Sequence, residues 1–177
     1  MTIARYIEAM RPNTRRQFRS WSGLPNRASL RRALLAAALI PGIASAALGE
    51  DATTVERDRI QMRAQRAVTQ AAGYAVHELQ LPGGMQVREY LTGANMVFAV
   101  RWSGPGIPDL QLLLGTHFAR YLAAAQASVQ ASGSPRRPLV VNDPDLVIHA
   151  SGHMRAFFGV AYLPQLVPAG VDIGQLR

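Results

Sequence analysis

The residues most suggestive of chemistry lie in the stretch IHASGHMRAFFGVAYLP, which runs from residue 148 to residue 164. His149 and His153 stand four positions apart, and Arg155 follows closely. On a helix, residues at this spacing share one face, so two histidines there can bind the same metal ion. On a strand, their directions depend on where the chain turns. The chemistry of this stretch therefore depends on its secondary structure.

The pattern around the two histidines is typical of strands. Apolar residues dominate both sides of Ser151-Gly152, and a two-residue turn there would pair His149 with Met154. In that register the two histidines point to opposite faces, while His153 and Arg155 share one face. A mononuclear metal site needs three or four converging ligands. We therefore predict no metal and no other cofactor.

Other catalytic signatures are missing from the sequence. With no cysteine, the chain has no disulfide, no thiolate zinc site and no thiol nucleophile. No G-x-S-x-G motif occurs. Asp143 and Asp145, the one closely spaced acid pair, flank Pro144 in a turn-like sequence. The sequence favours a non-catalytic protein over an enzyme. The alternative is a periplasmic hydrolase or metal-dependent enzyme that uses His153 and Arg155.

The positive charge of the chain is concentrated in its first 46 residues. The formal net charge is +8, and all 19 basic residues are arginine. Residues 1–46 contain eight arginines and one acid, whereas residues 47–177 contain eleven arginines and ten acids, a net charge of +1. A nearly neutral remainder lacks the basic surface that phosphate binding requires. We therefore expect no nucleic-acid partner.

The N-terminal segment has the organisation of an export signal. Arginines precede the apolar run ALLAAALIPGI at residues 33–43, and the small residues ASA follow it. This order predicts cleavage between Ala46 and Ala47 and a periplasmic or secreted protein that meets the membrane only through its signal. The run is short for a membrane span. TRRQF at residues 14–18 resembles a twin-arginine motif, so the export route stays open.

The remainder divides into a polar arm or short helix at residues 47–72 and one domain at residues 73–177. Within residues 73–103, three alternating runs are separated by PGG and TGAN, which predicts an antiparallel meander. In the third run, Met96, Phe98, Val100 and Trp102 form the more apolar face, which we assign to the core. Arg101 then lies on the opposite face.

The second half of the domain predicts a helix and a hairpin. Asp109 is a suitable N-cap for a helix from residue 110 to about residue 130. Two strands centred on Ser151-Gly152 follow it. The predicted fold is therefore α+β, with an antiparallel sheet of about five strands and the long helix packed on one face.

Arg101, His153 and Arg155 are the candidate ligand-binding residues. All three fall on the less apolar side of the predicted sheet, where arginine can hold an anionic group or an acidic partner. The alternative is that they are ordinary solvated residues. We expect an exported accessory protein that binds an unidentified protein or small ligand in the cell envelope through a sheet face or edge.

Three sequence stretches carry a family resemblance. They are VREYLTGANMVFAVRWSGPGIPDLQLLLGTHF, GHMRAFFGVAYLP and LVPAGVDIGQLR. In their order and spacing they resemble the exported proteobacterial proteins of the domain of unknown function 2844 family. The resemblance covers nearly all of residues 73–177, together with the signal and Ala47–Gly49. It implies export and a shared fold, and it assigns no catalytic residue.

We predict that the protein isolated from its native cells begins at Ala47, because the small residues before it fit the cleavage site of an exported chain. Mass spectrometry of the intact protein measures this directly. A protein that still carried Arg31 and Arg32 would contradict the prediction.

Overall fold

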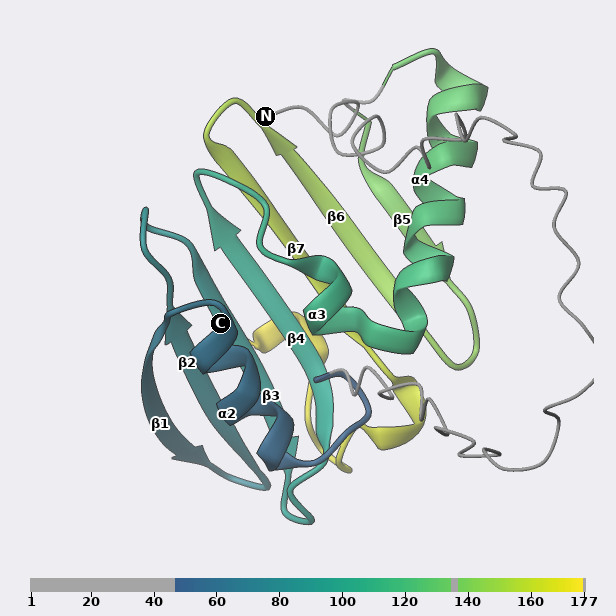
Figure 1. Ribbon diagram of the computed structural model, residues 1–177. Helices are drawn as coiled ribbons and strands as arrows, with labels where there is room; N and C mark the ends of the chain where they lie inside the picture. Colours follow the sequence, from purple (N-terminus) through teal and green to yellow (C-terminus); the bar gives the residue numbers. More distant parts are fainter. Residues whose placement is uncertain (1–46, 135–136, 177) are drawn as a thin grey trace, which may run out of the picture. The chain divides into compact units, whose positions relative to one another are not determined.

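The computed structural model describes residues 47–134 and 137–176 (Figure 1). The proposed signal segment, up to Ala46, lies outside the described residues. Within the described part of the chain, no helix is both long and apolar enough to cross a bilayer.

One antiparallel sheet organises the described residues, in the strand order β1-β2-β3-β4-β7-β6-β5. The strands are β1 (Gln65–Ala71), β2 (Tyr74–Gln80), β3 (Gln86–Thr92), β4 (Val97–Gly104), β5 (Leu139–Asn142), β6 (Val147–His153) and β7 (Ala156–Tyr162). The predicted meander is confirmed as β2-β3-β4. Short turns join neighbouring strands on each side, and the β4–β7 pairing joins the two halves.

The prediction of about five strands was wrong because β1 and β5 were missed. All seven residues of β1 are exposed. Its sequence therefore lacks the alternation of apolar and polar residues that marks a half-buried strand. The other omission, β5, has four residues and follows Pro138 directly. Both are edge strands, which need less burial than central strands.

Helices cover one face of the sheet, which we call the helix side (Figure 1). They are α2 (Ala52–Gln61), α3 (Leu110–Leu114), the 3-10 turn η1 (Gly115–His117) and α4 (Phe118–Ser132). The Asp51 carboxylate caps α2 by accepting from the Thr53 N–H at 2.7 Å. Asp109 caps α3 through the Leu112 N–H at 3.0 Å, as predicted.

The predicted single helix is interrupted at Gly115. This residue has a φ of 47°, a conformation that glycine adopts without strain. The chain makes one tighter turn there before α4 begins at Phe118. The long helix therefore shares the helix side with α2 and α3, and among the strands it contacts β5 most extensively.

The chain after β7 covers part of the opposite face. Residues 163–176, here called the tail, contain the short 3-10 turns η2 (Pro164–Leu166) and η3 (Ile173–Gln175). Leu176 is buried in one cluster with Tyr90, Phe98 and Ala99. The prediction that Phe98 shares a face with Val100 was therefore wrong. A register shift after Tyr90, next to Phe98 in β4, changes the side to which this ring points.

A tryptophan and a glycine meet where the two halves of the sheet join. Trp102 of β4 pairs with Gly159 of β7, and only 2% of the tryptophan is exposed. A Cβ atom added to Gly159 would lie 2.2 Å from Cζ2 of the indole. The indole therefore occupies the space that any other side chain at position 159 would need.

We predict that Gly159→Ala lowers the free energy of unfolding by about 1–3 kcal/mol, the usual cost of overpacking a core. Urea denaturation measures the change. Gly93→Ala is the matched control, because no atom lies within 4 Å of the added methyl group. Equal stabilities of the two variants would contradict the role assigned to the Trp102 contact.

Candidate functional site

The hairpin that carries the two histidines turns later than predicted. His153 pairs with Ala156, so the turn consists of Met154 and Arg155, and His149 pairs with Val160. Both histidines therefore lie on β6 and on the same side of the sheet, which corrects the prediction of opposite faces. Four residues along a strand separate them by about 13 Å. This separation is too large for a shared metal ion.

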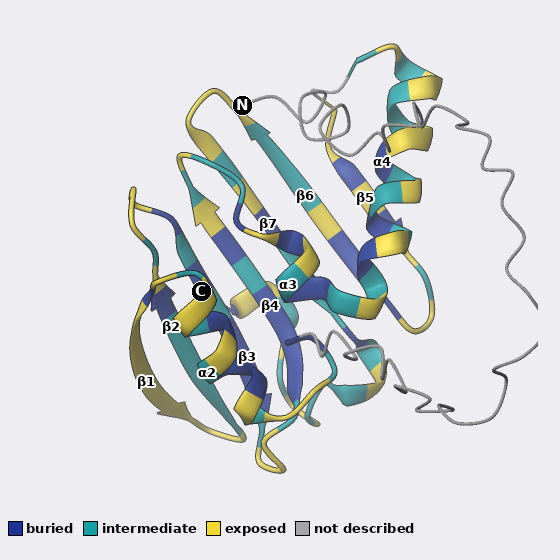
Figure 2. Cartoon of the chain, viewed as in Figure 1, coloured by how far each residue is buried: buried dark blue, intermediate teal, exposed yellow. Residues whose placement is uncertain are grey.

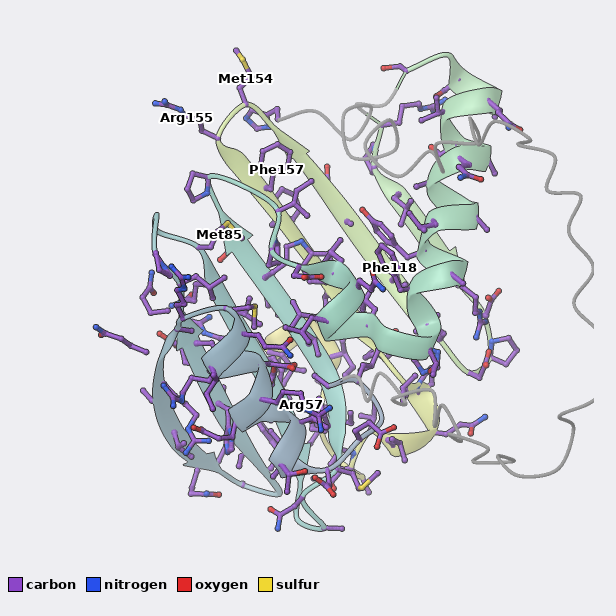
Figure 3. The ribbon with its side chains drawn as sticks, viewed as in Figure 1. Arg57, Met85, Phe118, Met154, Arg155 and Phe157 are labelled. Carbon is purple, nitrogen blue, oxygen red and sulfur yellow. The ribbon has the colours of Figure 1, made fainter. Side chains whose placement is uncertain are left out.

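The three candidate binding residues do not converge. Arg155 occupies the turn with a φ of 64°, and Figure 3 shows it projecting from the tip of the hairpin. Arg101 lies on the same side of the sheet as His153 but opposite Val160, four residues along β7 from Ala156. Its guanidinium donates to the backbone carbonyl of Leu176 in the tail. Arg101 therefore anchors the tail.

Asp143 and Asp145, the closely spaced acids of the sequence, also have a structural partner. Arg120 of α4 donates to both carboxylate oxygens of Asp145, at 2.7 and 2.9 Å, and also binds Asp143. These contacts hold the β5–β6 turn against α4. They also lower the pKa of Asp145. Among the described residues, no group of three or more acidic or histidine side chains is placed to hold a metal ion.

Part of the sheet opposite the helices remains open to solvent. This surface, here called the open face, comprises alternate residues of three strands: Val140 and Asn142 of β5, His149, Ser151 and His153 of β6, and Ala156, Phe158 and Val160 of β7. Phe158 is 52% exposed and Val140 is 54% exposed. Figure 2 shows exposed positions along this end of the sheet.

The open face combines apolar and polar side chains. Its polar groups are amide, hydroxyl and imidazole, and it contains no carboxylate or guanidinium. The His149 Nε2 lies 2.9 Å from the Asn142 Oδ1, so these two side chains bind each other. The β7 residues on this face thus include an exposed aromatic ring, Phe158. On the helix side, where space is limited, β7 instead has the small residues Gly159 and Ala161.

A second unusual site lies beneath α2, and the sequence reasoning missed it. Asp58 of α2 and Glu89 of β3 are both 0% exposed, and neither carboxylate has a hydrogen-bond donor among the described residues. His77 lies across β2–β3 from Glu89, and its Nδ1 is buried without a partner in the same part of the chain. The acids are 31 positions apart, so no sequence motif links them.

Burial raises the pKa of both acids. The pKa of Asp58 rises from 3.8 to about 7, mainly because the buried carboxylate is desolvated, and Asp109 adds to the effect. Burial, and then the charge of Asp58, raise the pKa of Glu89 well above its usual value. A proton held by one acid supplies the donor that the other lacks. Near neutral pH, we therefore describe the pair as two carboxyl groups that share a proton.

Nearby cations offset the effect of burial on the acid pair only in part. Arg57 lowers the pKa of Asp58, which burial nevertheless keeps raised. Arg66 of β1 lowers the pKa of Glu89 but binds Glu56 at 3.1 Å. Burial and Arg66 also lower the pKa of His77, which favours a neutral imidazole. Acids with pKa values near 7 suit general acid–base chemistry. Here, however, neither acid is exposed, so a substrate could reach the pair only if α2 moved away.

We predict that Glu89→Gln changes the free energy of unfolding, relative to the wild type at the same pH, more favourably at pH 8 than at pH 5. An acid whose pKa is raised by folding binds more protons in the folded state, so its contribution to stability falls as the pH rises above its unfolded value. For one proton the slope is at most about 1.4 kcal/mol per pH unit. Urea denaturation at both pH values measures the difference.

His77 and His117 have the opposite effect on stability, because their lowered pKa values make stability rise with pH below about 6.5. Comparing the variant with the wild type at each pH removes this contribution. Glu50→Gln is the control, because Glu50 is an exposed acid near the same helix. It should give the same change from the wild type at pH 5 and pH 8. The same pH-independent result for Glu89→Gln would contradict the shared proton.

Comparison with known proteins identifies a family without an assigned activity. A family model described as "Protein of unknown function (DUF2844)" matches residues 44–176. No curated protein and no solved structure gives a significant match. The matched region contains the whole described sheet, the open face and the buried acid pair. The chain therefore belongs to the DUF2844 family of proteins of unknown function.

Proposed function

We propose that this chain is exported to the periplasm or beyond the cell and acts there as a non-catalytic binding protein. Its open face binds an apolar, uncharged surface of another envelope protein. Export is supported by the arginines, apolar run and small residues before Ala47. The single observation that carries the binding proposal is the exposure of Phe158 on a sheet surface without carboxylate or guanidinium groups.

The composition of the open face favours a protein partner. The centres of protein interfaces are poor in charged residues and rich in aromatic residues. A phosphate-bearing ligand would require arginine or another donor cluster, and the nearest candidate, Arg101, binds the carbonyl of Leu176. The exposed valine and phenylalanine side chains fit an apolar partner surface, with the polar groups of β6 beside them.

An enzyme centred on His153 and Arg155 receives less support from the geometry. Arg155 lies in the turn, whereas His153 lies on the strand beside it. The acid pair offers suitable chemistry but is covered by α2. Catalysis at the acid pair needs a movement of α2, whereas the open face is exposed as it stands.

We predict that a photoreactive benzoylphenylalanine at position 158 cross-links to one envelope protein in intact cells, because the ring at this position is exposed on the proposed interface. The same probe at Gln126, an exposed position on α4, should not form that adduct. Gel electrophoresis followed by mass spectrometry identifies the adduct. An adduct of equal yield from both positions, or none from position 158, would sink the proposal.

The cross-linked protein is then purified and titrated against the wild type and Phe158→Arg. A guanidinium buried in an apolar interface should weaken binding at least about tenfold, or about 1.4 kcal/mol. Gln126→Arg adds the same charge on α4 and should leave the affinity unchanged. Unchanged affinity of Phe158→Arg would show that the partner binds elsewhere.

A further inference from the structure

The two edges of the sheet differ in how well they are protected against pairing with another strand. The β5 edge is short, follows a proline and lies against α4. By contrast, β1 is a regular seven-residue strand whose residues are all exposed, as Figure 2 shows. It pairs with β2 without a bulge from Gln65 to Ala71. Proteins usually protect such an edge by shortening it, bulging it or placing proline or several charges on it.

The side chains of β1 provide almost none of this protection. Its sequence, QRAVTQA, contains one charged residue and no proline. That residue, Arg66, forms a salt bridge with Glu56 of α2. Val68, at the middle of the strand, is 48% exposed on the helix side. Among the described residues only β2 pairs with β1, so the outward backbone groups of β1 are available to another strand.

The sequence of β1 is also compatible with pairing to itself. In an antiparallel pair of two β1 strands, all seven residues take part only when Val68 lies opposite Val68 of the second copy. Arg66 then lies opposite Gln70, and Ala67 opposite Thr69, so no like charges face each other. On an edge strand, every second residue points its backbone N–H and C=O groups away from the sheet. In this register the two β1 strands therefore form about six to eight interchain hydrogen bonds.

From the exposed edge of β1 and its compatibility with self-pairing we infer that the protein forms a twofold symmetric dimer through β1. The two sheets join edge to edge into one continuous sheet of twice seven strands. The twofold axis passes beside Val68, perpendicular to the sheet, so the helices of both copies lie on the same side. The open faces lie on the other side, separated by the strands between them. The dimer is therefore a bivalent form of the binding protein, although its formation does not depend on that proposed role.

The absence of cysteine allows a direct test of the register. In the proposed dimer, Val68→Cys places two thiols directly opposite each other, with Cβ atoms about 4.5–5.5 Å apart. Mild oxidation of the purified full chain, or a short bifunctional maleimide, should yield a covalent dimer as the main product. Val140→Cys is the matched control, since it replaces an equally exposed valine on the other edge strand. It should yield little covalent dimer under the same conditions.

The oligomeric state provides the second measurement. Because strand pairing alone gives a small interface, sedimentation of the full chain is followed from about 1 µM to about 500 µM. The mass should approach twice that of the monomer, and Val68→Lys should shift the midpoint at least tenfold toward higher concentration, because it places two ammonium groups opposite each other. Val140→Lys adds the same charge and should dimerise like the wild type.

A monomer throughout this range would overturn the inference, as would equal cross-linking from positions 68 and 140. A dimer unaffected by Val68→Lys would also overturn it, since the contact would then lie elsewhere. Circular dichroism and urea denaturation establish that Val68→Lys is folded. If it is not, Gln70→Lys, which faces Arg66 of the second copy in this register, replaces it as the charge variant. Failure of the dimer leaves the open-face proposal intact, because that proposal is tested at Phe158.

Discussion

The pairing of β4 with β7 is the contact on which the rest of the structure depends. These strands are separated by more than fifty residues of sequence, and their ladder joins the β1–β4 meander to the β5–β7 hairpins. Trp102 fixes this junction by filling the space over Gly159. The helices can then cover one face of a continuous sheet, while the tail covers part of the other. The open face lies on the part of that other side that the tail leaves uncovered.

The buried acid pair lies beneath α2, on the other side of the sheet from this open surface. Burial and the lack of a hydrogen-bond donor among the described residues favour a retained proton on two adjacent carboxyl groups, although Arg57 and Arg66 oppose this effect. The position of α2 over β3 is therefore coupled to the protonation state of Asp58 and Glu89. The open face and the acid pair beneath α2 lie on opposite sides of one sheet.

Local sequence signals predicted the elements whose cause is local. Asp109 was recognised as a cap because its carboxylate accepts a hydrogen bond only three residues away, and the meander was recognised from its alternation and its glycine turns. The hairpin register was predicted wrongly because Ser151-Gly152 resembles a turn. In fact Gly152 is required beside Phe157, where a Cβ atom would come within 2.6 Å of the ring, and Arg155 adopts the left-handed turn conformation instead. The acid pair depends on packing between α2 and β3, which no short window of sequence contains.

The anchoring of the tail constrains the order in which the fold can be completed during synthesis. Leu176 fills the cluster formed with Tyr90 and Phe98, and its carbonyl accepts from Arg101 in the middle of the sheet. A nascent chain that has emerged only as far as β6 has no partner for the free edge of β4 and nothing to cover that cluster. Its apolar surface stays exposed until residue 176 has emerged as well. A folding chaperone, or any factor that keeps the chain extended, can therefore act on this surface until the tail is in place.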